Sequence, residues 1–451
     1  MHEAQCVAAG VLERVAAGRN LDNELTVAWQ QLPREAADQP ANQRALVQDL
    51  CYGVLRHRGT IDAVLTPLLA RPLRDENVRQ LLRVALYQLL HTKAAPHAVV
   101  DHAVRACVAL PAVAAKGLVN GVLRNFLRRK AEMQALAASP VAGDEARYSF
   151  PAWWINKIRA QYPACFDELL LAGNRHAPLT LRINKRRVTR EMYLARLAAE
   201  GIAATALESH AIVLDKPVPV QRLPGFDEGL VSVQDASAQR AALLLDAQDG
   251  MRVLDACAAP GGKTAHVLEL ADVALTALDH DAARLARVNA NLVRLGLAAH
   301  VLCGDAADPR AWWDGQPFDR ILADVPCSAS GVTRRHPDIK WTRRASDIAR
   351  FAARQQSIID ALWRLLAAGG KFLYVTCSVF REENQEQVER FLARHADARL
   401  QTPAVATPAG TTAEQEQVER AERVGQLEQL AGQILPDAVH DGFYYALLQK
   451  A

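Results

Sequence analysis

The chain has 451 residues, of which half are hydrophobic and 23% are charged. This length is enough for two to four domains, and the composition excludes a disordered, collagen-like or purely repetitive protein. The formal net charge is only +3, so any basic surface that binds nucleic acid must be local.

The eight cysteines are widely spaced, without a C-x-x-C pair or the His-rich spacing of a zinc site. We therefore expect neither a disulfide framework nor a bound metal. No stretch approaches about 18 apolar residues without a charge, and the first residues lack the basic-then-apolar order of a signal peptide. Together these features predict a soluble protein of the reducing cytoplasm with no membrane partner.

Residues 1–140 are predicted to form an all-helical domain. Apolar residues recur at helical spacing, most clearly from Val78 to Leu90, and prolines divide the segment into pieces of helix length. A basic group lies near the end of the domain, at Arg124, Arg128, Arg129 and Lys130. This group either grips phosphates or is a solvated helix end whose cations favour the C-terminal dipole.

Residues 145–225 are predicted to form a small mixed α/β domain. An alternating strand begins at Leu181, a helix is expected over 190–200, and an apolar segment follows at 211–214. The densest positive patch of the chain lies in this domain, at Arg182, Lys185, Arg186, Arg187 and Arg190. Such a patch favours nucleic-acid binding, and a merely solvated run of charge is the alternative.

Residues 226–451 are predicted to form a Rossmann-like α/β domain around a parallel sheet, because strand patterns alternate with helix patterns such as 282–295. The expected strands, in chain order, are 253–256, 274–278, 300–302, 320–323, 372–376 and 442–448. Residues 401–433, rich in Thr, Pro, Ala, Gln and Glu, are expected to be a polar insertion, partly disordered or helical, without a chemical role.

A glycine-rich turn follows the first of these strands, at Cys257, Ala258, Ala259, Pro260, Gly261, Gly262 and Lys263. Glycines let a ligand approach the backbone, and the next helix offers unpaired N–H groups, so we expect a cofactor here. The dinucleotide fingerprint does not fit, because the two glycines are adjacent. The P-loop pattern matches only at its end: Cys257 replaces its first glycine, and Pro260 removes a backbone donor.

An acidic residue follows each of the next three strands, at Asp279, Asp305 and Asp324. The ends of parallel strands line one crevice, and a carboxylate about 20 residues past the glycine turn can hold the hydroxyls of a ribose. A triphosphate would be repelled by this charge unless magnesium intervened, whereas a cationic adenosyl cofactor such as S-adenosylmethionine suits it. Any one of these aspartates could instead be a helix N-cap.

Two cysteines follow the fourth and fifth strands: Cys327 in Asp-Val-Pro-Cys-Ser and Cys377 in Thr-Cys-Ser. Both should open onto the same crevice as the aspartates, whereas Cys257 and Cys303 read more simply as small buried hydrophobic residues. Methylation of carbon 5 of a pyrimidine requires a thiolate that adds to carbon 6 and a base that then removes the carbon 5 proton. Asp324 is placed to hydrogen-bond a cytosine and stabilise charge as the thiolate adds. The residues alone do not decide which cysteine attacks.

Four segments together resemble the RNA 5-methylcytosine methyltransferases of the NOL1/NOP2/Sun group: the glycine-rich turn, Asp324–Ser328, Gly331–Trp341 and Thr376–Ser378. Gln234–Gln239 is similar to a motif that precedes the core in that family. The first 140 residues resemble a NusB-like RNA-binding domain, an arrangement found in bacterial members that act on 16S ribosomal RNA (rRNA). The resemblance covers most of the chain, and it implies S-adenosylmethionine as cofactor and 16S rRNA as partner.

The resemblance also implies roles for individual residues. Cys377 would be the nucleophile, and Cys327 would assist release of the methylated product. The cofactor site would comprise residues 257–263 with Asp279, Asp305 and Asp324, and Asp279 would hold the ribose. The departures are mild, since Ser330 stands where the family often has threonine and the 401–433 stretch is long.

A further group of cations and an aromatic residue follows Cys327, at Arg334, Arg335, Lys340 and Trp341. We expect these side chains to contact RNA, because unstacked bases pack on such side chains and a target cytosine must be unstacked to reach a thiol. The alternative is that Trp341 packs in the core and the arginines are solvated.

Two other functions remain open on the sequence. One is a noncatalytic RNA-binding assembly or antitermination factor built on the helical domain, against which the two placed cysteines argue. The other is a P-loop ATPase, whose mark would be magnesium-dependent ATP binding. Of these, the sequence favours the methyltransferase, acting as a monomer.

Overall fold

The computed structural model describes residues 2–31, 39–110, 113–207, 211–401 and 432–451. The chain divides into two compact units: Met1–His176 with Thr333–Ala345, and Ala177–Val332 with Ser346–Ala451. The boundary after residue 176 divides the segment 145–225, which was predicted as one domain. Residues 333–345, predicted as part of the C-terminal domain, belong to the first unit. Most of the predicted polar insertion, residues 402–431, lies outside the described residues.

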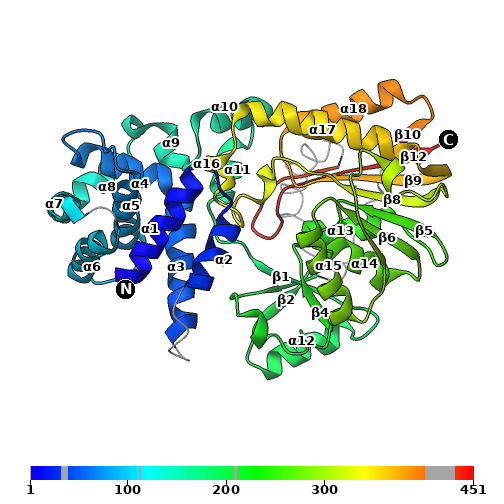
Figure 1. The fold of residues 1–451 in the computed structure, drawn as a ribbon, viewed down its shortest axis with the longest axis horizontal. Coiled ribbons are helices and arrows are strands. Elements are labelled where there is room, and N and C mark those ends of the chain that lie inside the picture. Colours follow the sequence, from blue (N-terminus) through cyan, green and yellow to red (C-terminus); the bar gives the residue numbers. More distant parts are fainter. Residues whose placement is uncertain (1, 32–38, 111–112, 208–210, 402–431) are drawn as a thin grey trace, which may run out of the picture. The chain divides into compact units, whose positions relative to one another are not determined.

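The first unit is helical, as predicted for its first 140 residues (Figure 1). Its helices are α1 (His2–Ala16), α2 (Leu21–Gln31), α3 (Gln39–Arg56), α4 (Arg58–Leu65), α5 (Glu76–His91), α6 (Pro96–Ala109), α7 (Lys116–Arg128), α8 (Lys130–Ala138), α9 (Gly143–Tyr148), α10 (Ala152–Gln161), α11 (Phe166–Ala172) and α16 (Ile339–Thr342). The apolar stripe from Val78 to Leu90 lies on α5, which packs at the centre of the unit. Asp75 caps the start of α5 by accepting a hydrogen bond from the Val78 amide, and Pro96 opens α6.

The second unit begins with a four-stranded antiparallel sheet in the order β2-β3-β1-β4. Its elements are β1 (Leu179–Ile183), α12 (Arg190–Ala199), β2 (Ala204–Ala206), β3 (Ala211–Leu214) and β4 (Val231–Val233). The sequence predicted β1, α12 and β3, but not the three-residue strands β2 and β4. Leu181, Ile212 and Val231 pack with α12 into the core of this sheet.

The larger sheet of the second unit has eight strands, in the order β10-β12-β9-β8-β5-β6-β7, with β11 also paired to β12. The strands are β5 (Arg252–Ala256), β6 (Ala274–Asp279), β7 (His300–Cys303), β8 (Phe318–Asp324), β9 (Leu366–Thr376), β10 (Ala398–Gln401), β11 (Gln433–Ile434) and β12 (Phe443–Lys450). All six predicted strands are therefore confirmed. The five strands from β5 to β9 are parallel, but β12 runs antiparallel to β9, so the sheet is mixed rather than purely parallel.

Helices cover both faces of the larger sheet (Figure 1). They are α13 (Ala236–Leu245), α14 (Gly262–Leu270) and α15 (Ala282–Leu295) on one face, and α17 (Ala345–Trp363) and α18 (Gln385–Arg394) on the other. Alternate strand residues divide between the two cores: Leu322 and Val375 face α13–α15, while Ile321 and Tyr374 face α17 and α18. This is the doubly wound arrangement, in which ligands bind at the carboxyl ends of the strands where the strand order reverses. In this sheet the order reverses between β5 and β8.

Candidate active site

The glycine-rich turn connects β5 to α14 at this reversal point. Gly261 has a φ of +95°, and a Cβ added there would lie 3.1 Å from Val288, so the turn requires a glycine at this position. Helix α14 begins at the next residue, which leaves its first amides at the edge of the crevice. The predicted strand–turn–helix context of the cofactor loop is therefore present.

The two polar side chains that a P-loop would use are each bound to a carboxylate. The Lys263 ammonium lies 2.6 Å from Asp324, and this pairing raises the pKa of Lys263 against the opposing effect of burial. The Thr264 hydroxyl donates to the buried Asp255 carboxylate at 2.5 Å. Burial raises the pKa of Asp255 to about 7. This arrangement disfavours the triphosphate alternative.

Asp279 and Asp305 lie at the ends of neighbouring strands, as predicted. The nearly buried Asp279 carboxylate accepts hydrogen bonds from the amides of Ala259 and Asp281, both at 3.1 Å. It therefore connects the glycine-rich turn to the end of β6. Asp305 accepts from the Ala307 amide at 2.8 Å and pairs with Arg354 of α17 at 2.5 Å. These bonds to Ala307 and Arg354 lower the pKa of Asp305 despite its partial burial.

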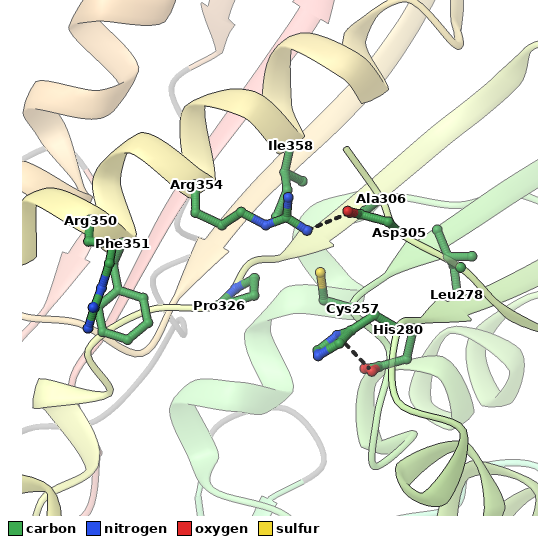
Figure 2. Close-up of a pocket in the computed structure, with 12 residues that line it drawn as sticks. Cys257, Leu278, His280, Asp305, Ala306, Pro326, Arg350, Phe351, Arg354 and Ile358 are labelled. Atoms are coloured by element: carbon green, nitrogen blue, oxygen red, sulfur yellow. Dashed lines mark hydrogen bonds and ion pairs between the residues drawn. The ribbon is translucent and has the colours of Figure 1, made fainter. Parts of the chain in front are cut away.

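A cavity of about 410 Å³ opens between these two aspartates and α17 (Figure 2). Its apolar lining is formed by Cys257, Leu278, Ala306, Pro326, Phe351 and Ile358. Figure 2 shows the Arg354–Asp305 pair at one side and His280 at the other. A ring nitrogen of His280 lies 3.4 Å from the Asp279 carboxylate. Burial raises the pKa of the Cys257 thiol, which keeps that side chain neutral. Apolar walls with carboxylates at the rim fit a flat uncharged ring joined to a sugar.

The two predicted cysteines lie together at the same end of the sheet. They follow the adjacent parallel strands β8 and β9, and their sulfur atoms are 3.4 Å apart. The hydrogen bond with Cys377, followed by burial, raises the pKa of Cys327 well above its usual range, and the charge of Glu383 adds to this effect. Only two residues separate Asp324 from Cys327. The Lys263–Asp324 pair and the Cys327 thiol therefore both lie at the end of β8.

Sequence reasoning missed two residues of this region. Arg354 lies on α17 and is bound to Asp305. Glu383 is buried next to the two loops that follow β8 and β9 and carry Cys327 and Cys377, called here the cysteine loops. Neither belongs to a motif with a recognisable spacing. The nearest signal is the acidic pair Glu382-Glu383 shortly after Cys377, which could equally begin a surface helix.

The prediction that Arg182 belongs to an exposed basic patch is wrong. Arg182 is fully buried, and two of its nitrogens bind the Glu269 carboxylate at 2.9 and 2.6 Å. Its third nitrogen donates to the Gln234 side chain and to the carbonyl oxygen of Gly262. The strand alternation that predicted β1 also turns this side chain inward, where a carboxylate compensates for its burial.

Lys185, Arg186 and Arg187 of the same run are exposed. Arg187 donates to the backbone carbonyls of Glu228 and Leu295, and Arg186 donates to that of Glu269 at 3.3 Å. They remain candidates for RNA contact at the edge of the small sheet.

The prediction that Arg334 and Lys340 are presented to RNA is also wrong, because both are buried in the first unit. The Lys340 ammonium donates to the carbonyl oxygen of Arg56 at 3.1 Å and to the Asn174 side chain at 2.6 Å. It also lies 4.5 Å from the ring centroid of Phe150. Two oxygen acceptors and a ring face thus compensate for the burial of the Lys340 ammonium.

Trp341 packs against the helical core, as the alternative interpretation held. Its indole N–H donates to the carbonyl oxygen of Leu55 at 2.7 Å, and the guanidinium of Arg58 stacks over its ring. Arg335 is half-buried and stays a candidate for RNA contact.

All eight cysteines are free thiols. Across the described part of the chain, no three His, Cys, Asp or Glu side chains are grouped closely enough to hold a metal ion. Among the helices that the structure describes, none has the length and apolar character needed to span a membrane.

Three family models match successive parts of the chain. The NusB family matches residues 2–128, a ferredoxin-like domain of RsmF/B-like methyltransferases matches 150–221, and the 16S rRNA methyltransferase RsmB/F family matches 242–449.

Relatives resemble the chain over its whole length. The ribosomal RNA small subunit methyltransferase B of Vibrio cholerae is 42% identical, over 100% of this chain and 98% of the relative. The protein of the same name from Escherichia coli is also 42% identical, over 98% of each chain. The solved structure of PH0851 has the same fold, with a TM-score of 0.75 at 23% identity over 99% of each chain. The chain therefore belongs to the 16S rRNA methyltransferase RsmB/F family.

Proposed function

We propose that the protein transfers a methyl group from S-adenosylmethionine to carbon 5 of a cytosine in 16S rRNA, with Cys377 as nucleophile and Cys327 assisting product release. The observation that carries this proposal is the pair of thiols 3.4 Å apart at the ends of β8 and β9. Methylation of ribosomal RNA follows from the family. The atom that is methylated and the roles of the cysteines are inferred from the chemistry of the site.

The proposed domains are 1–140 for an RNA-binding helical domain, 145–225 for a small RNA-binding domain, and 226–451 for the methyltransferase. The three family matches, at 2–128, 150–221 and 242–449, support this order. The proposed partner is 16S rRNA, and the protein would act as a monomer in the cytoplasm.

The cavity at the end of β6 suits the adenosine part of the cofactor. Its apolar walls would enclose the base, and Asp279 would accept hydrogen bonds from the ribose hydroxyls. The backbone of residues 257–263 and the Asp305 carboxylate complete the site. When bound, S-adenosylmethionine supplies a methyl group carried on a positively charged sulfur.

The reaction needs a thiolate before the methyl transfer and a proton acceptor after it. The Cys377 thiolate would add to carbon 6 of the cytosine, so that electron density moves to carbon 5, which then takes the methyl group. Removal of the carbon 5 proton restores the double bond and breaks the carbon–sulfur bond. Asp324, held by Lys263, would accept a hydrogen bond from the amino group of the cytosine and share a proton with ring nitrogen 3, which becomes more basic as the thiolate adds.

Charges around the two thiols differ in a way that supports these roles. Cys377 is among the groups whose charge helps to raise the pKa of Lys263, so a cation lies in the surroundings of Cys377. Glu383 interacts with Cys327, and it helps to hold the pKa of Cys327 high. Once Cys377 is bonded to the base, its hydrogen bond no longer raises the pKa of Cys327. Cys327 can then more easily become the proton acceptor.

The test is methyl transfer from labelled S-adenosylmethionine to unmodified 16S rRNA, followed by digestion to nucleosides. We expect labelled 5-methylcytidine with the wild type and none with Cys377→Ser. Cys327→Ser should accumulate a covalent protein–RNA complex that survives denaturation. Cys165→Ser, which changes a half-buried cysteine of the first unit, is the matched control and should behave like the wild type.

The other outcomes are equally informative. If Cys377→Ser still formed labelled 5-methylcytidine, and a covalent protein–RNA complex accumulated only when Cys377 was replaced, then Cys327 would be the nucleophile and Cys377 would assist product release. Label in a different nucleoside would refute cytosine carbon 5 as the target. No transfer by the wild type to free rRNA or to small ribosomal subunits would refute the proposed activity.

A further inference from the structure

We propose that Glu383 is a positioning residue that ties the two cysteine loops together and sets the distance between the sulfur atoms of Cys327 and Cys377. This inference rests on the proposed function and deepens it. Glu383 ends the short 3-10 turn Arg381–Glu383 that follows β9, and its side chain is fully buried. Burial of a carboxylate costs free energy unless several hydrogen-bond donors compensate it. The donors to Glu383 therefore identify the groups that its side chain holds in place.

The donors to Glu383 come from both cysteine loops. The amide of Ser328 donates to one carboxylate oxygen at 2.8 Å, and the Ser328 hydroxyl donates to the other at 2.5 Å. The Ser378 hydroxyl donates to that second oxygen at 2.6 Å. Each serine directly follows one of the two cysteines, so a single carboxylate holds the residue next to each thiol. Bonds of this kind, in which one partner is ionised, are short and strong.

Neighbouring groups lock the carboxylate itself. Gln355 of α17 donates to Glu383 at 3.1 Å and to the carbonyl oxygen of Pro326 at 3.0 Å. The Tyr374 hydroxyl donates to the backbone carbonyl of Glu383 at 2.5 Å. The turn is therefore fixed against both α17 and β9, and Pro326 directly precedes Cys327.

A third serine closes the cluster. The hydroxyl of Ser330 lies 3.1 Å from that of Ser328 and 3.0 Å from that of Ser378, and it accepts a hydrogen bond from the Val379 amide at 2.9 Å. The hydroxyl of Ser378 accepts from the Phe380 amide at 3.0 Å. All three serines are buried. Hydrogen bonds between these serines thus connect the two cysteine loops to each other next to the thiols.

The electrostatic surroundings fit the same role. Burial raises the pKa of Glu383, while the bonds from Ser328, Ser378 and Gln355 oppose that shift. The carboxylate contributes to the high pKa of Cys327. Glu383 would contact neither base nor cofactor, and it would act only through the loops that it holds. A displacement of about 1 Å at a reacting group can lower a rate by about 100-fold, so such a tie matters for catalysis.

The first experiment measures thiol proximity without any methyl transfer. Diamide, a diazene oxidant, takes two electrons and two protons from Cys327 and Cys377 to form one disulfide, and is itself reduced to a hydrazine. The rate of this disulfide is followed by quenching with iodoacetamide and mapping peptides by mass spectrometry. We expect Glu383→Ala to slow the reaction about tenfold or more, and Glu383→Gln to restore most of the rate, because its amide can bond the same serines.

Glu24→Ala is the matched control. It removes another buried glutamate, which pairs with Arg14 in the first unit, and it should leave the rate of disulfide formation unchanged. If Glu383→Ala does not fold, the double variant Ser328→Ala with Ser378→Ala carries the same expectation, because it removes both hydroxyl donors. A wild-type rate of disulfide formation in the folded variant would overturn the proposal, even if methyl transfer were lost.

The second experiment separates positioning from binding in methyl transfer. Glu383→Ala should lower kcat by about 10- to 100-fold and leave KM for S-adenosylmethionine and for RNA within about twofold. Glu383→Gln should recover most of kcat. A variant that raised KM with unchanged kcat would contradict a positioning role. Because the disulfide measurement needs no substrate, an error in the proposed reaction would leave that result intact.

Discussion

The cysteine loops and the segment Thr333–Ala345 are neighbours in the chain, but they belong to different compact units and are held by different interactions. The loops of Cys327 and Cys377 are tied by a buried carboxylate and serine hydroxyls. Lys340 is held by neutral acceptors and an aromatic ring, and burial lowers its pKa well below the usual range. Closeness in sequence to a reactive cysteine therefore does not make a residue part of the chemistry. The first region should govern catalysis, and the second should govern the stability of the helical unit.

The largest expected effect is a loss of methyl transfer, without a matching loss of stability, when Cys377 is replaced. Cys377→Ser should lower the rate of 5-methylcytidine formation by about 10³-fold or more, because a hydroxyl is a far weaker nucleophile than a thiolate. The free energy of unfolding should change by less than about 1 kcal/mol, since the two side chains are similar in size. Rates from the labelled assay and urea unfolding curves give the two quantities. A large loss of stability would show that Cys377 also has a structural role.

The reverse pattern is expected at Lys340. Lys340→Ala should destabilise the helical unit by about 3 kcal/mol, because it leaves a cavity and two buried oxygen acceptors, on Arg56 and Asn174, without their donor. Lys340→Met keeps most of the volume and should cost about half as much. Hydrogen–deuterium exchange of peptides from 333–345 and from α3 reports the loss directly. Unchanged hydrogen–deuterium exchange in Lys340→Ala would show that Lys340 does not stabilise this segment.

An effect of comparable size, up to about 4 kcal/mol, is expected from Asp255 within the cysteine-bearing unit. Burial raises its pKa from 3.8 to about 7, so between these values the folded protein holds a proton that the unfolded chain has released. The unfolding free energy should therefore fall as pH rises from about 4 to about 7. Asp255→Asn cannot titrate and should flatten this fall, as measured by urea unfolding at each pH. Asp314→Asn, at an exposed carboxylate beside Arg252, should leave it in place.

The smallest effect concerns the basic run that remains exposed. Lys185→Glu with Arg186→Glu should weaken binding of 16S rRNA about tenfold near physiological salt and reduce the slope of log K against log salt by about 1 to 2. The double variant Arg310→Glu with Arg399→Glu makes the same change in net charge at exposed positions far along the chain. Equal effects from the two variants would mean that only net charge matters and that the 185–186 surface is no RNA site.

The sequence predicted the strand ends well, because position relative to a parallel strand follows from periodicity alone. Asp279, Asp305, Asp324, Cys327 and Cys377 each follow a hydrophobic strand, and parallel strands share one carboxyl edge. The 3.4 Å approach of the thiols depends on the adjacency of β8 and β9, which the order of strands along the chain does not give.

The sequence was less informative about charged side chains, because charge density does not say which cations find a buried partner. Arg182 and Lys185 lie in one basic run, yet Arg182 meets Glu269 in the interior and Lys185 is exposed. The partner of Arg182 lies 87 residues away along the chain. Glu383 was overlooked for the same reason, since its donors come from two loops and from α17.

The placement of Thr333–Ala345 in the helical unit has a consequence for biosynthesis. The first 176 residues leave the ribosome well before this segment, so the helical unit is completed only after residue 345 has been made. At ~5–20 residues per second, the surface that receives Trp341 and Lys340 stays uncovered for roughly 10 to 30 seconds. Throughout that interval the nascent chain exposes the part of the helical core against which Trp341 later packs, and a chaperone could shield that surface.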